Sequence, residues 1–208
     1  MRSFNSAGIP LAQEKEIKLI GNCNDTTMVG SDILIYLMVY NLVENAIKYN
    51  HFGGQADVFS LPVSRDETIA VDALVDEVLV DLEPLAQEKK IKLIGNCKDT
   101  TMVGSDILIY RMVYNLVENA IKYNHFGGQV TVTAYRKGKS ICLSVEDTGS
   151  GIPAELKERI FEPFFRVDKS RSRQLGGVGL GLALVHEIVR VHDGRITVQS
   201  SPSGGTIS

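Results

Sequence analysis

The sequence predicts an α/β fold in which helices cover one face of a β-sheet. Residues 130–135 and 141–146 alternate apolar and polar side chains, which is typical of strands with one buried face. Residues 71–89, 105–123 and 180–191 instead place apolar side chains at helical spacing. One sheet face covered by helices is the simplest arrangement that buries both sets.

The first elements of this fold follow a connecting stretch. Residues 56–70 are expected to link two parts of the chain and to end in a short strand. The helix expected over 71–89 contains Pro84, which should kink or divide it, because proline lacks the N–H that a helix interior needs. Residues 91–97 (IKLIGNC) predict the next strand.

The central helix begins after a residue suited to cap it. Ser105 has a side-chain oxygen that can accept from the first helical turn, and the helix should stop near residues 123–127. The two alternating strands follow, joined by a turn at residues 137–139. A last helix is expected after a glycine-rich stretch, with one buried stripe made by Leu180, Leu184, Ile188 and Val191.

The N-terminal part contains a repeat. Pro10–Gln55 reappears 74 positions later as Pro84–Gln129, a span of 46 residues. Solenoid repeats share a pattern and vary elsewhere, so near-identity indicates a recent duplication or an added segment. The first copy is followed by a different sequence and therefore lacks the motifs that follow the second copy. We expect it to form only an incomplete second half-site, within an N-terminal extension, residues 1–65. The three differences are Glu16/Lys90, Asn24/Lys98 and Leu37/Arg111.

Composition argues against several classes of partner and against a membrane-spanning segment. The 208 residues are 44% apolar, which suits one domain plus an extension. A net charge of -3 gives no electrostatic footprint for nucleic acid. Three cysteines without a CxxC pair predict neither a disulfide framework nor a zinc site and favour a reducing cytoplasm. The longest nearly apolar run, Ile33–Val43, is too short to cross a bilayer, although a parent protein anchored in a membrane stays compatible.

The stretch NLVENAIKYN, residues 115–124, carries a polar stripe on an otherwise apolar helix. Asn115, Asn119 and Lys122 fall within about 60° of one another at the helical repeat. Amide oxygens suit a hard cation such as Mg²⁺, and an ammonium suits a phosphate. Taken alone, the stretch is equally typical of an amphipathic helix whose polar side meets water.

The strand ending at residue 146 continues into DTGSGI, residues 147–152. Glycines at alternate positions let a backbone approach a planar ligand, and the Asp147 carboxylate can accept a hydrogen bond from an exocyclic amine such as that of adenine. By itself this motif is more often an ordinary polar turn.

Two further motifs follow. FEPFF, residues 161–165, precedes a polar, basic segment and predicts the hinge of a lid spanning about 153–178, with Arg166, Lys169, Arg171 and Arg173 able to reach an anion. The alternative is a surface loop anchored by its phenylalanines. GVGLGL, residues 177–182, opens a helix, where free N–H groups and the positive end of the helix dipole favour phosphate. It matches neither a Walker loop nor a Rossmann fingerprint.

In order and spacing, these four motifs resemble the ATP-binding catalytic domain of sensor histidine kinases, within the superfamily that includes DNA gyrase, MutL and the heat-shock chaperone ATPases. Asn119 precedes Asp147 by 28 positions, and Asp147 precedes Gly177 by 30. The resemblance covers residues 66–208. It implies a Bergerat-type fold, a two-layer sandwich with a mixed, mainly antiparallel sheet under about three helices.

The resemblance also implies a function and its residues. It implies binding of ATP and Mg²⁺ and transfer of the γ-phosphoryl group to a histidine on a separate dimerisation domain, with a response regulator downstream. Asn119 matches the magnesium ligand, supported by Asn115, and Asp147 matches the carboxylate that reads adenine. The remaining implied ATP-binding residues are Lys122, Tyr123, Gly149, Gly151, Ile152, Arg166, Gly177, Gly179, Leu180, Gly181, Leu182 and Thr206.

The chain departs from the family pattern in two places. It has no motif for the phosphoacceptor histidine, since His186 lies in the helix after the glycine loop and is expected at the surface. It also stops at Ser208, where the family usually continues through a final strand, which leaves that strand in question. No catalytic residue is assigned: Glu118 points about 100° away from Asn119 and is expected to pair with Lys122 at i, i+4. His192 is expected near a helix end where a cation is mildly favourable.

Two other functions stay open from the sequence. One is an anti-sigma-type serine kinase of the same superfamily, against which the long basic lid argues. The other is a non-catalytic assembly module, in which the duplicated segment forms a homodimer by occupying the place of its twin in a neighbouring molecule. Leu37 in the copy, where the second segment has Arg111, suits burial against protein.

Overall fold

The computed structural model describes residues 18–21, 55–58, 67–98, 100–167, 179–201 and 205–207. The chain divides into two compact units, Met1–Pro62 and Val63–Ser208, which we treat separately. The boundary expected between residues 65 and 66 lies three positions after this division.

The described part of the second unit contains three α-helices and seven strands. The helices are α3 (Val71–Glu88), α4 (Asp106–Lys122) and α6 (Gly181–Val191). The strands are β3 (Glu67–Ala70), β4 (Lys92–Cys97), β5 (Thr101–Gly104), β6 (Gln129–Lys137), β7 (Ser140–Asp147), β8 (Gln199–Ser200) and β9 (Thr206–Ile207).

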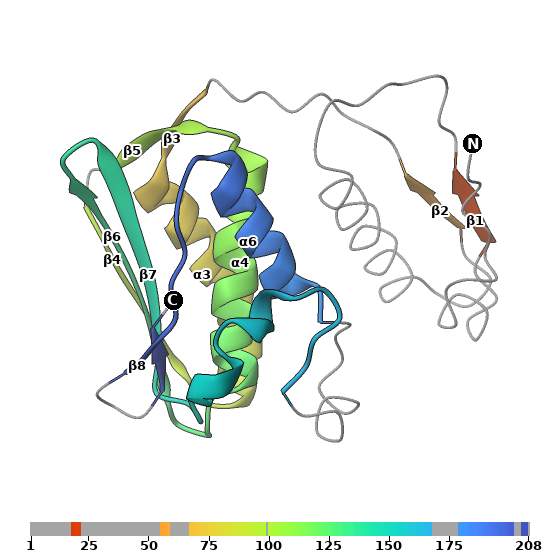
Figure 1. Cartoon of the computed structure of the whole chain (residues 1–208), viewed down its shortest axis with the longest axis vertical. Helices are drawn as coiled ribbons and strands as arrows, with labels where there is room; N and C mark the ends of the chain where they lie inside the picture. The colour runs from red at the N-terminus through yellow and green to blue at the C-terminus, as the bar shows by residue number, and fades with distance from the viewer. Residues whose placement is uncertain are drawn as a thin grey trace. The chain divides into compact units, whose positions relative to one another are not determined.

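Five strands form one mixed sheet in the order β4-β6-β7-β9-β8. Strands β4 and β6 run parallel, and the other neighbours run antiparallel. Helices α3, α4 and α6 lie on one face of this sheet (Figure 1). The predicted fold class, a mainly antiparallel sheet covered on one face by about three helices, is confirmed. Strand β9 lies between β7 and β8, so the short C-terminal stretch does add a strand to the sheet.

The core lies between the sheet and the helices because each element buries one side. Strand β6 alternates as predicted, with Val130, Val132 and Ala134 at most 2% exposed. Helix α4 buries a stripe of six apolar residues, and α6 buries four. Helix α6 keeps Leu184 and Ile188 of the predicted stripe in the core, whereas Val191 is only half-buried.

The beginnings of the helices are fixed by different contacts. Ser105 caps α4 as predicted, since its side chain accepts a hydrogen bond from the backbone N–H of Leu108 at 3.5 Å. Helix α3 has no side-chain cap, and the N–H of Val71 donates instead to the carbonyl of Thr100 at 2.8 Å.

Two expectations from the sequence were wrong or incomplete. Pro84 does not divide the first helix, because α3 runs unbroken through it. Pro84 is exposed, and Val80, whose carbonyl loses its usual helical partner, is 71% exposed, so water can satisfy that carbonyl. Strand β5 was not predicted. It pairs antiparallel with β3 in a separate two-stranded sheet.

The first unit reproduces one feature of the second. Its two described strands, β1 (Lys18–Gly21) and β2 (Gln55–Val58), pair in parallel with Lys18 opposite Gln55. Strands β4 and β6 pair in parallel with Lys92 opposite Gln129, which are the same positions of the repeat. The two units therefore share the register of this strand pair, although only Gln55 of β2 belongs to the repeat.

The helices were also compared with the length and hydropathy that a membrane span requires. Within the described residues, no helix is both long enough and apolar enough to cross a bilayer.

Candidate functional site

Asp147 ends strand β7 with its carboxyl group held in place. The backbone N–H of Gly149 donates to its Oδ1 at 2.7 Å, and the backbone of Thr206 makes a second hydrogen bond to the carboxyl group. Burial raises the pKa of Asp147, the two backbone hydrogen bonds lower it in part, and the neighbouring charge of Glu146 raises it again. The carboxyl group is thus oriented but costly to keep ionised.

The turn after Asp147 lies against the end of α4. A Cβ atom on Gly149 would lie 2.6 Å from the carbonyl oxygen of Tyr123, so only glycine fits this approach. The N–H of Ser150 donates to the same carbonyl at 3.4 Å. Gly151 has a φ of 67°, which glycine adopts without strain. The predicted residues Asp147, Gly149 and Tyr123 are therefore brought together.

Asn115 contacts the start of α6. Its Nδ2 donates to the carbonyl of Arg111 at 2.7 Å, which directs Oδ1 away from its own helix. A Cβ atom on Gly181 would lie 2.7 Å from that Oδ1. The absence of a side chain at Gly181 thus allows the N-terminus of α6 to approach the Asn115 amide closely.

Asn119 and Lys122 continue the same side of α4, and both are half-buried. Lys122 Nζ lies 2.9 Å from Glu118 Oε1, which confirms the predicted i, i+4 pair. Asn119 lies one turn from Asn115 and one turn from Tyr123, between the contact with α6 and the contact with the β7 turn. Helix α4 therefore carries one continuous row of polar groups along the candidate site.

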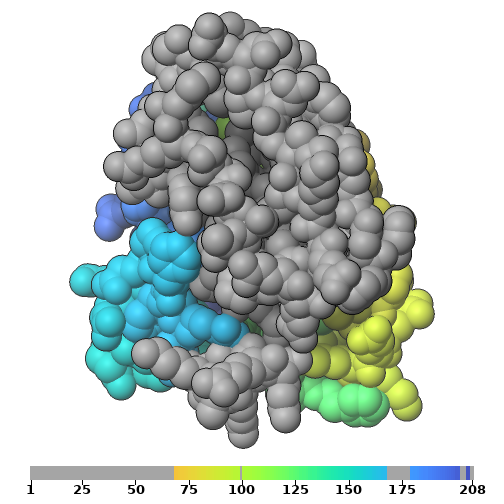
Figure 2. All heavy atoms as spheres, turned by 90° about the vertical axis from the view of Figure 1, so that its right-hand side faces the viewer, coloured from red at the N-terminus to blue at the C-terminus, as the bar shows by residue number. Residues whose placement is uncertain are grey.

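The first part of the predicted lid is anchored by aromatic contacts. Two 3-10 turns, Ala154–Leu156 and Arg159–Phe161, bring the Arg159 guanidinium to 4.4 Å from the centre of the Phe165 ring. The Phe161 ring packs against His186 of α6 with centroids 5.6 Å apart. Residues 150–167 form the cyan surface in Figure 2.

The glycine loop is bound to this segment. The N–H of Phe164 donates to the carbonyl of Gly179 at 2.9 Å, and Gly179 has a φ of 78°. A Cβ atom on Gly179 would lie 2.7 Å from the carbonyl oxygen of Phe165. Residues 168–178, with Gly177, Lys169, Arg171 and Arg173, lie outside the described part of the chain.

The other predicted residues differ in their exposure. Tyr123 is 53% exposed beside the β7 turn, whereas Thr206 is 8% exposed and bonds through its backbone to Asp147. Leu180 is 2% exposed and belongs to the core. Residues that are half-buried in the loops and in α6 are Ile152, Arg166 and Leu182.

Asn124, which is 8% exposed, forms a polar network that was not predicted from the sequence. Its Oδ1 accepts from Thr148 Oγ1 at 3.1 Å and from the N–H of His125 at 3.0 Å, and its Nδ2 donates to the carbonyl of Gln129 at 3.0 Å. The network joins the end of α4, the start of β6 and the turn after β7. A signal was present, because Asn124 closes the stretch that supplied the other candidates.

Lys89 was also missed, although it supports the end of α4. Its Nζ donates to the carbonyls of Ile121 at 3.1 Å and Lys122 at 2.5 Å, and its own carbonyl accepts from the N–H of Gly127 at 2.9 Å. Burial lowers the pKa of Lys89. No sequence signal could have found this contact, because the partners are 32 and 33 residues away.

We expect Lys89→Met to lower the free energy of unfolding by about 1 kcal/mol, because the last carbonyls of α4 lose a charged donor at the negative end of the helix dipole. Urea unfolding measures the change. The control is Lys139→Met, since Lys139 is exposed in the turn between β6 and β7 and should tolerate the same substitution. Equal effects of the two substitutions would show that the Lys89 contact does not support α4.

Known proteins match this part of the chain. The sequence profile of the histidine kinase-, DNA gyrase B-, and HSP90-like ATPases matches residues 104–208. Sensor-like histidine kinase SenX3 of Mycobacterium bovis is 40% identical over 139 residues, which are 66% of this chain and 34% of SenX3. Adaptive-response sensory kinase SasA of Crocosphaera subtropica is 41% identical over 136 residues, 64% of this chain and 35% of SasA. The chain spans about a third of the length of these relatives.

Solved structures of histidine kinases are similar to this chain in fold. The catalytic domain of the histidine kinase ThkA has a TM-score of 0.62 and 26% identity, covering 69% of this chain and 92% of that domain. The mycobacterial sensor histidine kinase MprB has a TM-score of 0.58 and 28% identity, covering 68% of this chain and 93% of the solved one.

Proposed function

Because the chain belongs to the family of histidine kinase-, DNA gyrase B- and HSP90-like ATPases, we propose that it binds Mg·ATP and transfers the γ-phosphoryl group to a histidine on a separate dimerisation domain. The chain contains the ATPase catalytic domain of this family, and its relatives are named sensor histidine kinases. The observation that carries the proposal is the convergence on α4 of the Asp147 turn and the glycine loop of α6.

Asp147 forms the adenine end of the proposed site. A carboxylate held by two backbone amides can accept a hydrogen bond from an exocyclic amine without having to be oriented first. The close approach of Gly149 to Tyr123 leaves the turn without side-chain bulk where a flat base would lie. The adenine-side residues of the proposal are Tyr123, Asp147, Gly149, Gly151, Ile152 and Thr206.

Asn115, Asn119 and the glycine loop form the phosphate end. Within the described residues, no group of three or more acidic, histidine or cysteine side chains could hold a metal ion, so amide oxygens are the candidate ligands. We assign Asn119 as the magnesium ligand with Asn115 in support, because Asn119 lies one turn along α4 from Asn115, whose Oδ1 lies against the N-terminus of α6. Bound Mg·ATP would supply the transferable phosphoryl group and the charge of the metal. The phosphate-side residues are Lys122, Arg166, Gly177, Gly179, Leu180, Gly181 and Leu182.

The chain's own side chains act by binding and orientation. Glu118 is bound to Lys122, which leaves it poorly suited to remove a proton from an acceptor. Lys122 must share or leave this ion pair to reach a phosphate. Positioning and charge neutralisation are the usual sources of catalysis in phosphoryl transfer, and they need no general base in this domain.

The proposed partners are the histidine-containing dimerisation domain of the parent kinase and a response regulator downstream. ATP chemistry and the free cysteines of the described residues, Cys97 and Cys142, favour the cytoplasm. The negative net charge still gives no reason to expect nucleic acid. The serine-kinase alternative shares the site but differs in the acceptor, so the acceptor decides between the two.

The test supplies the missing acceptor. The chain is mixed with γ-labelled ATP, Mg²⁺ and either a histidine-bearing helical hairpin of a sensor kinase or a serine-bearing partner protein. We expect label on the histidine, in an acid-labile form, and clearly less of it with Asp147→Asn at an ATP concentration below saturation. Label on serine would establish the alternative, and failure to label either partner while ATP is bound would contradict catalysis by this chain.

The N-terminal copy is proposed to be an incomplete half-site. It contains Asn41, Asn45 and Lys48 but lacks counterparts of the Asp147 turn and the glycine loop. Support comes from the shared register of β1–β2 and β4–β6. Such a copy can form a homodimer by taking the place of its twin in a second chain. Size measurement across a concentration series tests this, since a strictly monomeric chain would contradict it.

A pH dependence follows from the raised pKa of Asp147. As pH falls from neutral toward the ordinary aspartate pKa of about 3.9, Asp147 gains a proton earlier than an exposed aspartate, and ATP binding should weaken.

The contribution of Asp147 to the stability of the fold changes with pH in the opposite direction. The folded pKa lies above the unfolded one, so Asp147 contributes stability at low pH that is lost as pH rises through the folded pKa. Calorimetric titrations and melting curves across this range measure both, and Asp147→Asn should flatten them.

A further inference from the structure

His192, directly after α6, joins the far ends of two helices that carry the proposed site. Its Nδ1 lies 2.8 Å from the carbonyl oxygen of Ile188, and its Nε2 lies 3.5 Å from the backbone nitrogen of Ser105. A backbone N–H can only donate, so Nε2 is the acceptor and the hydrogen lies on Nδ1, which donates to Ile188. His192 therefore lies at the end of a helix, as expected, and its ring bridges the end of α6 to the start of α4.

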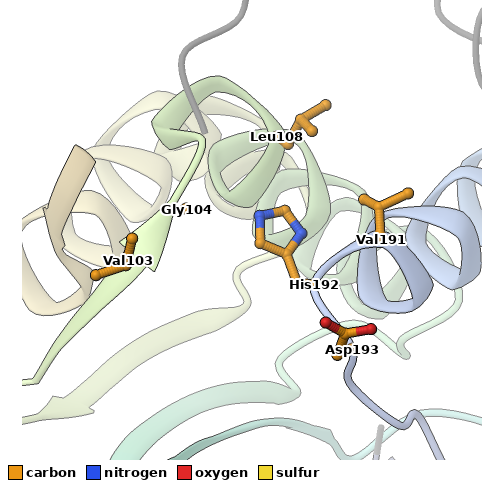
Figure 3. A pocket seen from close by; sticks show the side chains of 6 residues that line it. All are labelled: Val103, Gly104, Leu108, Val191, His192 and Asp193. Carbon is orange, nitrogen blue, oxygen red and sulfur yellow. The ribbon is translucent and has the colours of Figure 1, made fainter. Parts of the chain in front are cut away.

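The fold leaves room for this ring. A Cβ atom on Gly104 would lie 2.9 Å from Nε2, so a larger residue there would displace the imidazole. Ser105 is 1% exposed, and its buried N–H has little access to water as an alternative acceptor. The ring lines a pocket of about 210 Å³ between β5, α4 and α6 (Figure 3), together with Val103, Gly104, Leu108, Val191 and Asp193.

The two ends of α6 contact the same partner helix. At its start, Gly181 lies against Asn115 of α4, and just beyond its end, His192 bonds to the cap residue of α4. Helices α4 and α6 lie side by side (Figure 1). The eleven residues of α6 form a helix about 16 Å long. Because Ala183, Leu184, Val185 and Ile188 are at most 5% exposed, α6 is packed against the core along its length.

We propose that His192 is a positioning residue for ATP binding: by accepting from Ser105, it fixes the register of α6 on α4 and so the distance between Gly181 and Asn115. This inference rests on the proposed function of that site. His192 touches no nucleotide in this account, because it lies at the opposite end of α6 from the glycine loop.

Two substitutions of His192 distinguish the effect of its hydrogen bond to Ser105 from the effect of its packing. In His192→Gln, the side-chain oxygen can replace Nε2 as the acceptor for Ser105. In His192→Asn, the shorter amide can still reach the carbonyl of Ile188 but not Ser105. Asp193→Asn is the matched control, since Asp193 lines the same pocket and asparagine tolerates its φ of 54°.

The experiment measures ATP affinity and Ser105 amide exchange in the full chain. We expect His192→Asn to weaken ATP binding about fivefold, while His192→Gln and Asp193→Asn stay within about twofold of the unchanged chain. The Ser105 amide should exchange faster in nucleotide-free His192→Asn than in His192→Gln. Unchanged affinity in His192→Asn, or equal losses in the asparagine and glutamine variants, would overturn the positioning role. Absence of ATP binding by the unchanged chain would instead overturn the proposed function, and with it the role that rests on it.

Discussion

Asp147→Asn should weaken ATP binding at least about tenfold, which corresponds to about 1.4 kcal/mol, a typical loss for one hydrogen bond to a charged group. The asparagine oxygen can still accept from Gly149, as Oδ1 does now at 2.7 Å. The second oxygen becomes an NH₂ group, which cannot accept from an exocyclic amine. The hydrogen bond from Gly149 is kept, and the acceptor for the exocyclic amine is lost.

The same substitution should not lower stability. Burial raises the pKa of Asp147, so the folded chain holds a carboxylate at neutral pH at some cost, which asparagine removes. Calorimetric titration and thermal unfolding at neutral pH measure the two effects. Glu146→Gln is the control: Glu146 precedes Asp147 on the other face of β7 and accepts from Ser201. Equal ATP affinities for Asp147→Asn and the unchanged chain would remove the adenine end of the proposed site.

Gly205→Ala should lower the free energy of unfolding by about 3 kcal/mol, the upper end for overpacking a buried position. A Cβ atom there would lie 2.0 Å from the carbonyl oxygen of Asp147 and 2.6 Å from its Oδ1. Strand β9 and the turn at Ser201, whose N–H donates to Gly205 at 2.9 Å, would have to move away from β7. Because the Thr206 backbone bonds to Asp147, ATP binding should weaken as well.

Denaturant unfolding measures the effect of Gly205→Ala. The control is Gly138→Asn in the turn between β6 and β7. Nothing lies within 4 Å of a Cβ atom on Gly138, and asparagine tolerates its φ of 63°. We expect the control to change stability by less than about 0.5 kcal/mol. A Gly205→Ala chain as stable as this control would mean that β9 does not pack on Asp147 as described.

The sequence predicted the elements whose signal is local. The alternation in β6 and β7 and the helical spacing in α3, α4 and α6 each lie within one segment. Strands β5, β8 and β9 are two to four residues long and exist only through pairing with distant partners, so no periodicity could show them. Pro84 was misjudged because its effect depends on whether the freed carbonyl meets water, which requires knowing which side of α3 is exposed.

In the candidate site too, residues with a local sequence signal were predicted and residues that depend on distant partners were not. The motifs supplied Asn115, Asn119, Asp147 and the glycines, because each is a chemical type at a fixed spacing. The groups that hold these residues in place were not predicted. Asn124 reaches Thr148 across 24 residues, and His192 reaches Ser105 across 87. Such contacts depend on how α4, β7 and α6 pack together, which spacing along the chain does not contain.

The repeat shows how identical sequence can have unequal consequences. A parallel strand pair in the same register forms in both units, although residues 56–58 of β2 lie beyond the repeat and differ from residues 130–132 of β6. Only the second copy continues into β7, the Asp147 turn and α6. We therefore infer that a nucleotide site depends on the elements that follow the repeat and that a second copy of the polar helix alone adds none.

Calorimetric titration of the full chain with ATP and Mg²⁺, counting sites and repeated with Asn119→Ala and Asn45→Ala, tests the central claim most directly. Asn45 is the equivalent of Asn119 in the first copy and therefore the matched control. We expect one site per chain, lost with Asn119→Ala and unchanged with Asn45→Ala. Two sites, no binding, or loss with Asn45→Ala would contradict a single nucleotide site formed by α4, the Asp147 turn and the start of α6.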